Sequence, residues 1–325
     1  MPRKLISTLE PQEQVDQTFR IADKQLRANR QGGKYILLRL SDRSGTLTGM
    51  LWNAEESHFQ SCESGDIARC RGRLQLFNGA MQMIVTSIAK VEVDPAEEAD
   101  FQRFDPDRAE ARQSRLREIL GGIEDEWLRR LGLAFLNDPA FMERFAQAPA
   151  AITHHHAYPG GLLDHTVDLM ELSLIVAPRY PNIHLDLVLI GAFLHDLGKI
   201  EEMSGGDELS YTDRGQLVGH IVIGVQMLYE KTVVVAAEMG QTFPEQIRWQ
   251  LEHLILSHHG QLEYGSPKLP QTLEAILLHQ LDHLDAKIAA ATAVIESDVS
   301  GEGHWTNYHP SLGRKLWKGD PLRHS

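Results

Sequence analysis

The sequence contains only two cysteines, Cys62 and Cys70, among its 325 residues. Their spacing is too wide for a CxxC motif, and two thiols cannot build the disulfide framework of a small secreted domain. We therefore expect both to be reduced thiols in a cytoplasmic protein. The first residues, Met1-Pro2-Arg3-Lys4, lead into polar and acidic sequence without an apolar stretch, so we expect no signal peptide.

Long hydrophobic runs are also missing. No stretch of about 18 or more uncharged apolar residues occurs, so a membrane span is not expected. Internal repeats and low-complexity tracts are absent, which excludes a solenoid or a biased, disordered chain. Hydrophobic residues (42%) and charged residues (24%) occur at the level of soluble globular proteins, so the chain can bury a sizeable core. Its length allows two domains.

The chain has no net positive charge; its formal net charge at pH 7 is −13. This argues at first against a nucleic-acid partner. Residues 19–91 differ, since eleven Lys and Arg face six Asp and Glu there, a local charge of +5 that leaves −18 for the remainder. A basic module joined to an acidic one suits a polyanion-binding domain beside a carboxylate-bearing metal site. An ordinary solvated surface would explain a charge of +5 equally well.

The N-terminal third of the chain reads as strands. Residues 1–18 form a polar lead-in, and from Tyr35 short apolar or alternating runs are separated by turn residues. Asn78-Gly79 is a strong hairpin signal. About five short strands within some 75 residues fit a small barrel. The clearest expected strands are 35–40, 46–52, 67–77 and 80–85. An acidic, Pro-containing linker at 92–108 ends the pattern.

From residue 109 the apolar spacing is helical, and Pro and Gly punctuate it. The expected helices cover roughly 110–133, 139–147, 162–177, 185–197, 215–239, 244–258 and 270–297. The sequence therefore predicts an all-α domain over residues 109–303. The last residues, 304–325, contain Gly, Pro and several aromatics, and we expect a tail rather than a domain.

His195 and Asp196 stand side by side after an apolar helical stretch, where an imidazole and a carboxylate can grip one metal ion. Four further elements surround the pair at wide spacing: His165, His220, His258-His259 and Asp282. A helix bundle can bring such residues to one pocket. Nitrogen and oxygen ligands without paired thiolates suit Mn, Fe, Co, Ni or Zn in a reactive site. A single His on an apolar helix is more often a hydrogen-bonded group than a ligand, so the prediction rests on the whole set.

The ordered pattern His165, His195-Asp196-x-x-Lys199, His220, His258-His259, Asp282 resembles the HD-domain metal-dependent phosphohydrolases in their two-metal form. The segments 158–166, 256–267 and 281–287 are similar to the YhaM-type 3′→5′ exoribonucleases. Residues 40–46 and Leu51-Trp52 resemble the OB-fold that such enzymes carry before the HD domain. HDxxK alone is a weak motif, but the full ordered set behind an OB-like module is specific, and the resemblance covers nearly the whole chain.

This resemblance implies a multi-domain chain: a small N-terminal β-barrel of the OB-fold type at 19–91, then an all-α HD-domain helical bundle at 109–303. It implies a phosphodiesterase that trims single-stranded RNA, and sometimes DNA, from the 3′ end to nucleoside 5′-monophosphates. Two divalent metal ions would activate water, with Mn²⁺ as first choice and Co²⁺, Fe²⁺, Ni²⁺ or Zn²⁺ as alternatives.

The expected ligands divide into two groups that share Asp196 as a bridge. One metal ion would take His165, His195, Asp196 and Asp282, and the other would take Asp196, His220, His258 and His259. One of the last two histidines could instead contact a phosphate. Lys199, one turn beyond Asp196, would face a phosphate oxygen or remain a solvated lysine at a helix end.

An OB barrel offers a groove in which bases stack on aromatic rings and phosphates meet basic side chains. The candidates are Tyr35, Arg39, Trp52, Arg71, Arg73 and Phe77. Trp52 and Phe77 lie on strands, where aromatic residues more often belong to the core. Two other functions stay open: a nucleotide or cyclic-dinucleotide phosphohydrolase, which needs no strand-binding barrel, and an inactive nucleic-acid-binding protein, which needs no complete ligand set. The apolar helices also leave room for a homo-oligomer.

Overall fold

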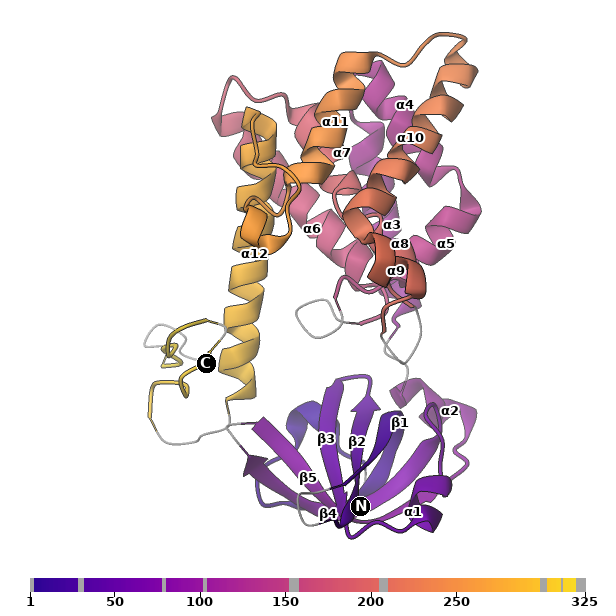
Figure 1. Ribbon diagram of the computed structural model, residues 1–325, viewed down its shortest axis with the longest axis vertical. Helices are drawn as coiled ribbons and strands as arrows, with labels where there is room; N and C mark the ends of the chain where they lie inside the picture. The colour runs from indigo at the N-terminus through magenta and orange to yellow at the C-terminus, as the bar shows by residue number, and fades with distance from the viewer. Residues whose placement is uncertain are drawn as a thin grey trace. The chain divides into compact units, whose positions relative to one another are not determined.

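The computed structural model describes residues 3–28, 32–77, 80–101, 104–151, 158–204, 210–298, 303–310 and 312–319. The chain forms two compact units. One comprises Met1–Arg103 together with Ala290–Ser325 and contains all the strands described, and the other comprises Phe104–Ala289 and is helical (Figure 1). The expected change from strands to helices along the chain is confirmed.

Five strands close into a barrel in the order β1-β2-β3-β5-β4. They are β1 (Gln14–Ala28), β2 (Lys34–Asp42), β3 (Gly45–Trp52), β4 (Ile67–Phe77) and β5 (Ala80–Lys90). Neighbouring strands pair antiparallel except β3 and β5, which are parallel. The short helix α1 (Glu56–Gln60) joins β3 to β4. This five-stranded closed barrel is an OB-fold, as the resemblance implied.

The longest strand, β1, was not anticipated, because residues 1–18 were expected to be a lead-in. Polar residues outnumber apolar ones in its first half, but Val15, Phe19 and Ile21 are buried in the barrel core. The strand pairs with both β2 and β4 and so closes the barrel, which satisfies its backbone polar groups. Around the expected hairpin, Phe77 pairs with Ala80; the turn itself, residues 78–79, lies outside the described residues.

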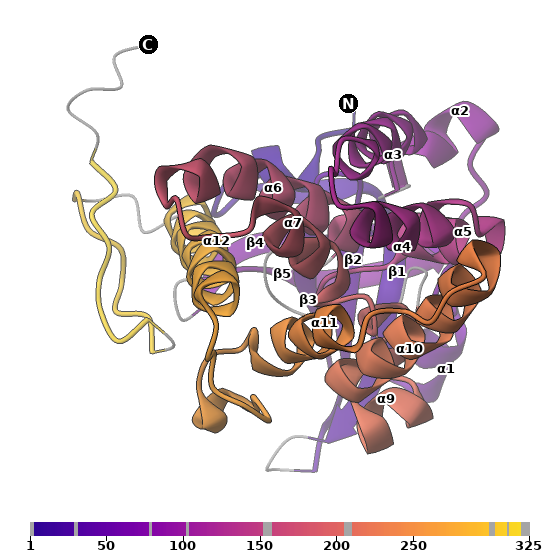
Figure 2. The same ribbon diagram turned by 90° about the horizontal axis from the view of Figure 1, so that it is seen from above.

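The helical unit buries one large apolar core. Its helices are α3 (Pro106–Gly121), α4 (Glu126–Leu136), α5 (Pro139–Gln147), α6 (Gly161–Val176), α7 (Leu185–Leu194), α8 (Lys199–Glu202), α9 (Asp213–Val218), α10 (His220–Met239), α11 (Glu245–Ser257) and the first part of α12 (Leu273–Ser297). The central helix is α7, which is buried from Leu187 to Leu194 and lies between α6 and α11 (Figure 2). The expected linker at 92–108 contains α2 (Pro95–Glu98) and the start of α3.

The structure interrupts three of the expected helices, at 110–133, 185–197 and 215–239. The first is divided near Gly122, and the second ends at Leu194 before the short helix α8. The third breaks at Gly219, whose φ of 78° lies in the left-handed region that favours glycine. Each break shortens a helix that the apolar pattern alone would have continued. The second and third breaks place His195 and His220 at helix ends.

In the described part of the chain, α10 is the one helix that is long and apolar enough to cross a membrane. This is weak evidence for a span, because the core helices of soluble proteins have the same length and composition. Leu228 and Val235 of α10 are buried in the apolar core of the helical unit. Their packing is what a core helix requires.

Candidate metal centre and nucleic-acid surface

All seven side chains expected to bind metal converge within the helical unit. They come from α6 (His165), the turn after α7 (His195, Asp196), the first residue of α10 (His220), the turn after α11 (His258, His259) and the middle of α12 (Asp282). Five chain segments that are distant in sequence therefore supply one centre, and His165, His195, Asp196 and His258 are buried there.

One cluster consists of His165, His195 and Asp282, each of which offers one ligand atom within 4.8 Å of the other two. The Nε2 atom of His165 lies 3.2 Å from Nε2 of His195 and 3.3 Å from Oδ1 of Asp282. Two imidazole nitrogens and one carboxylate oxygen thus meet at one point, which is a common partial ligand set for a divalent transition metal.

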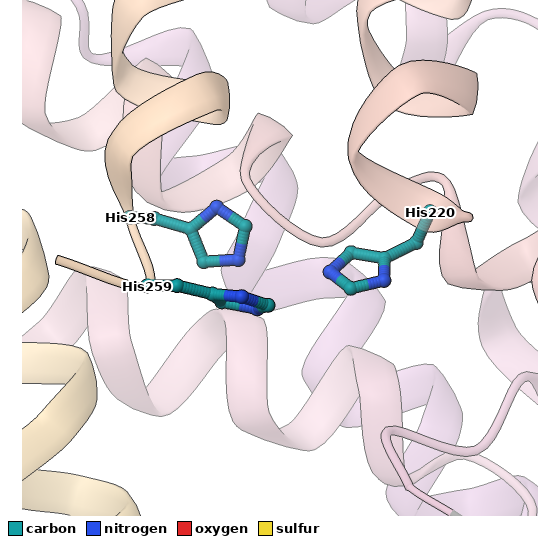
Figure 3. A group of neighbouring side chains, drawn as sticks. All are labelled: His220, His258 and His259. Atoms are coloured by element: carbon teal, nitrogen blue, oxygen red, sulfur yellow. The ribbon is translucent and has the colours of Figure 1, made fainter. Parts of the chain in front are cut away.

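A second cluster consists of His220, His258 and His259, again with one ligand atom each within 4.8 Å of the others. Figure 3 shows His258 and His259 projecting from the end of one helix toward His220 on another. The rings of His258 and His259 are close, with centroids 4.3 Å apart. The geometry brings the two neighbouring histidines to the same cluster.

Asp196 lies between the two clusters. Its Oδ2 is 3.3 Å from Nε2 of His195 and 3.9 Å from Nε2 of His165, both in the first cluster. Its Oδ1 is 3.6 Å from Nε2 of His220 and 3.6 Å from Nε2 of His258, both in the second. One carboxylate therefore presents one oxygen to each cluster.

Backbone carbonyls orient three of the imidazoles. Nδ1 of His195 donates to the Ala192 carbonyl at 2.8 Å, and Nδ1 of His258 donates to the Ile255 carbonyl at 2.7 Å. His259 makes the same kind of bond to Tyr264 at 2.9 Å. Because a carbonyl can only accept, each Nδ1 carries the proton and each Nε2 keeps its lone pair for a ligand.

Two carboxylates orient the other imidazoles, and sequence reasoning did not single them out. Oε1 of Glu202 accepts from the backbone N–H of His220 at 2.9 Å and lies 3.0 Å from its Nδ1. Oδ2 of Asp285 lies 3.2 Å from Nδ1 of His165. Such partners fix the ring of a metal-binding histidine. For Asp285 the signal was its position three residues after Asp282, on the same face of α12.

Lys199 contacts Asp196 directly, with Nζ 2.6 Å from Oδ2. Burial raises the pKa of Asp196, but the Lys199 ammonium and His195 outweigh it and hold that pKa well below its usual range. Burial lowers the pKa of Lys199, but Asp196 outweighs it and raises that pKa. The two groups therefore form a buried ion pair at neutral pH.

The protonation of the imidazoles differs between the clusters. Burial lowers the pKa of His258, and burial together with His258 and His220 lowers the pKa of His259 to about 4. Both are neutral at pH 7, which is the form that binds metal. For His165, burial lowers the pKa, but Asp282 and Asp285 outweigh it and raise it to about 10, so these carboxylates favour the protonated ring.

The centre fits a divalent metal ion. Oδ1 of Asp196, Nε2 of His220 and Nε2 of His258 are buried, and none of them has a hydrogen-bond partner among the residues described. Buried polar atoms are rarely left without a partner. These three atoms are imidazole nitrogens and a carboxylate oxygen, and a cation bound between them would give each one a partner. The turn that carries Asp196 packs closely against the start of α10, because a Cβ atom at Gly198 would collide with the carbonyl oxygen of His220.

The barrel carries an aromatic pair, half-buried Tyr35 and exposed Trp52, on the face of β2 and β3. Tyr35 pairs with Trp52 across the two strands, and their ring centroids are 5.0 Å apart. Trp52 is 46% exposed, so the alternative that it belongs to the core is wrong. Arg39 is exposed four residues after Tyr35 and so lies on the same face. The same face therefore carries an aromatic pair and, further along β2, a cation.

The other three barrel candidates lie on β4. Phe77 is 59% exposed, which also excludes a core position, and Arg71 and Arg73 are exposed. In the barrel order, β1 separates β4 from β2, and β5 separates it from β3. These residues therefore do not adjoin Tyr35 and Trp52. Arg71 is also paired with a carboxylate, Asp16, at 3.0 Å.

A closed OB barrel followed by a helical unit with a buried His/Asp centre defines a nucleic-acid-binding metal hydrolase. Comparison with known families agrees: the model of the OB-fold nucleic acid binding domain matches residues 20–91, and the model of the HD domain matches residues 162–287. The HD domain and the two clusters together indicate divalent metal binding.

Curated relatives cover most of the chain. The 3′-5′ exoribonuclease YhaM of Listeria monocytogenes serotype 4b is 33% identical over 272 residues, 83% of this chain and 84% of the relative. The protein of the same name from Bacillus subtilis (strain 168) is 33% identical over 293 residues, 89% of this chain and 90% of the relative. The chain belongs to the family of the YhaM 3′-5′ exoribonucleases.

Proposed function

We propose that this chain is a metal-dependent 3′→5′ exonuclease that hydrolyses single-stranded RNA, with DNA as a second substrate, to nucleoside 5′-monophosphates. The observation that carries the proposal is Asp196, whose two oxygens face two separate ligand clusters. The relatives named 3′-5′ exoribonucleases support the direction of cleavage. The barrel (19–91) would hold the RNA strand, and the helical domain (109–303) would cut its 3′ end. The protein would act in the cytoplasm.

Each cluster would hold one divalent ion, and Mn²⁺ is the first candidate. His165, His195 and Asp282 would hold one ion, and His220, His258 and His259 the other, with Asp196 shared between them. Each set offers three ligand atoms besides the Asp196 oxygen that faces it. When bound, such a pair of ions lowers the pKa of a water molecule and neutralises charge on phosphate oxygens.

The residues of the chain prepare the centre for that chemistry. Lys199 keeps Asp196 ionised and brings a positive charge to the edge of the centre, where it can also meet a phosphate oxygen. Glu202 and Asp285 hold the rings of His220 and His165 in place. Because these side chains are oriented before the substrate binds, no free energy is needed to reorganise them during the reaction.

On the barrel, Tyr35 and Trp52 would stack bases and Arg39 would meet phosphates. The face of β2 and β3 is the usual binding face of an OB-fold, and base stacking on exposed aromatic rings accepts any sequence. Phe77 and Arg73 on β4 would make a separate contact with the strand, because β1 and β5 lie between β4 and this face. Arg71 would contribute less, because Asp16 already neutralises its charge.

The decisive experiment compares single-stranded RNA labelled at its 3′ end with the same RNA labelled at its 5′ end, in the presence of Mn²⁺. We expect immediate release of labelled mononucleotide from the 3′ label and stepwise shortening from the 5′ label. Asp196→Asn should lower the rate by about 10³-fold or more, which corresponds to about 4 kcal/mol of activation free energy. RNA binding should stay largely intact. The exposed Asp213→Asn is the matched control.

Three outcomes would contradict the proposal. Release of mononucleotide first from the 5′ label would reverse the polarity. Turnover of a cyclic dinucleotide or a free nucleotide, without turnover of RNA, would indicate a small-molecule phosphohydrolase. Binding of RNA without turnover in Mn²⁺, Co²⁺, Fe²⁺, Ni²⁺ or Zn²⁺ would indicate an inactive binding protein.

A further inference from the structure

The C-terminal residues 303–310 and 312–319, expected from the sequence as part of a tail, form a small hairpin (yellow in Figure 1). The backbone N–H of Thr306 donates to the carbonyl of Leu316 at 2.8 Å, and that of Lys318 donates to the carbonyl of His304 at 2.8 Å. His309 and Arg314 form a further bridge nearer the turn. The backbone is thus held in a defined antiparallel pairing.

The hairpin presents aromatic rings to solvent. Trp305 and Trp317 pair directly across the two strands, with ring centroids 5.2 Å apart, and they are 55% and 48% exposed. Thr306, the next residue along, is buried, as expected when successive side chains point to opposite faces of a strand. Tyr308 is also 59% exposed. Because Trp305 and Trp317 are neighbours across the strands, they form one exposed aromatic surface, whereas Tyr308, two residues after Thr306, lies on the other side of its strand.

The hairpin is also positively charged. Residues 303–319 contain Arg314, Lys315 and Lys318 and neither Asp nor Glu, in a chain whose net charge is −13. Lys318 pairs with Asp298 at 3.6 Å, and Asp298 also accepts from the backbone of Asn307, so this acid anchors the hairpin to the chain beyond α12. Arg314 and Lys315 are exposed, and neither makes an ion pair with any carboxylate in the described part of the chain.

We propose that this hairpin is a second contact surface for single-stranded RNA, distinct from the barrel. Bases would stack on Trp305 and Trp317, and phosphates would meet Arg314 and Lys315. Exposed rings and cations without carboxylate partners on one hairpin suit a ligand that carries planar bases and a charge on every residue. The choice of RNA rests on the proposed function, and the placement of the surface rests on the hairpin itself.

The test measures binding of the full chain to a fluorescently labelled 20-nucleotide oligouridylate, by anisotropy at several salt concentrations with EDTA present to prevent turnover. The double variant Trp305→Ala/Trp317→Ala should raise Kd about tenfold or more, because each base stack contributes strongly to affinity. The double variant Arg314→Gln/Lys315→Gln should reduce the slope of log K against log salt by about 1.4, since each phosphate contact on a single strand accounts for about 0.7.

Matched controls separate these effects from general ones. Trp249→Ala removes an exposed Trp on α11, and Arg129→Gln/Arg130→Gln removes two positive charges from α4; both should bind as the wild type does. Trp305→Phe/Trp317→Phe keeps two rings and should retain most of the affinity. If the Ala variant loses the hairpin, the exposed Arg314 and Lys315 still provide a test on a folded chain. Wild-type Kd and salt slope in both double variants would overturn the proposal.

Hydrolysis of a dinucleotide, with Mn²⁺ in place of EDTA, distinguishes this proposal from the proposed function. A dinucleotide needs only the metal centre, so kcat/KM for it should stay at the wild-type value in both hairpin variants, while KM for the 20-nucleotide RNA rises. A wild-type chain that hydrolyses neither substrate would refute the nuclease function. The binding measurement would still decide whether the hairpin contacts RNA.

Discussion

Lys199 reaches back one helical turn to Asp196, with its Nζ 2.6 Å from Oδ2. The other oxygen of the same carboxylate is buried and has no hydrogen-bond partner among the described residues. The lysine therefore fixes one side of the carboxylate and leaves Oδ1 facing His220 and His258. The turn between α7 and α8 holds both residues in this relationship.

We predict that Lys199→Met lowers kcat on RNA by about 10²-fold. Without the ammonium, the pKa of Asp196 rises, and a positive charge beside the substrate phosphates is lost. Lys199→Arg should restore part of the rate, because it keeps the charge but not the compact geometry. Single-turnover kinetics with saturating Mn²⁺ measure the effect. Equal rates for Lys199→Met and wild type would show that Lys199 pairs with Asp196 without contributing to the reaction.

Glu202→Ala should weaken metal binding about 10- to 100-fold, because the ring of His220 loses the carboxylate that orients it. The neighbouring Glu201→Ala is the control, since Glu201 pairs with Arg144 and Arg214 and not with a ligand. Titration calorimetry with Mn²⁺ gives the affinity, and the dependence of rate on Mn²⁺ gives an independent value. A normal Mn²⁺ affinity in Glu202→Ala would remove this residue from the centre.

Trp52→Ala should raise KM for long RNA by about tenfold and leave kcat/KM for a dinucleotide unchanged. Trp52 is exposed on the barrel, where it would stack a base, and it is not one of the proposed metal ligands. Trp52→Phe should keep most of the affinity. Steady-state kinetics on the two substrates provide the comparison. Equal loss on both substrates would mean that the substitution damages the fold or the centre instead of a binding surface.

Asp138 offers a test of stability against pH. It caps α5 by accepting from the backbone of Phe141, and it pairs with Lys231 on α10 at 2.7 Å. The hydrogen bond from Lys231, with that from Phe141, lowers the pKa of Asp138. Because the folded-state pKa lies below that of the unfolded chain, this group stabilises the fold at neutral pH, and the effect is lost as pH falls below about 4.

We therefore predict that Asp138→Asn, which keeps a capping side chain, costs about 0.5 kcal/mol of unfolding free energy at pH 7. Asp138→Ala should cost about 1 kcal/mol more, because the cap is lost as well. Urea denaturation at pH 7 and at pH 3 measures both, and the difference between wild type and Asp138→Asn should shrink in acid. A constant difference at the two pH values would show that the ion pair contributes nothing.

Much of the fold followed from local patterns. Short apolar or alternating runs indicated β2 to β5, and helical spacing indicated the later bundle. The failures have a common cause. The strand β1 has too few apolar residues to stand out, and it forms because β2 and β4 pair with its two halves. The breaks before α8 and α10 interrupt apolar sequence that favours a continuous helix. Gly219 adopts left-handed backbone before α10, and Gly198 before α8 packs against the His220 carbonyl.

The sequence by itself indicated the seven candidate metal ligands, because its histidines and aspartates follow the order of an HD-type ligand set. It did not show that Asp196 would turn one oxygen to each cluster, nor that Glu202 and Asp285 would hold two of the rings. Nor did it show that Trp52, Phe77, Trp305 and Trp317 would be exposed. Those relationships join residues that are far apart along the chain or on opposite strands, so packing of the elements, and not local sequence, sets their distances and exposure.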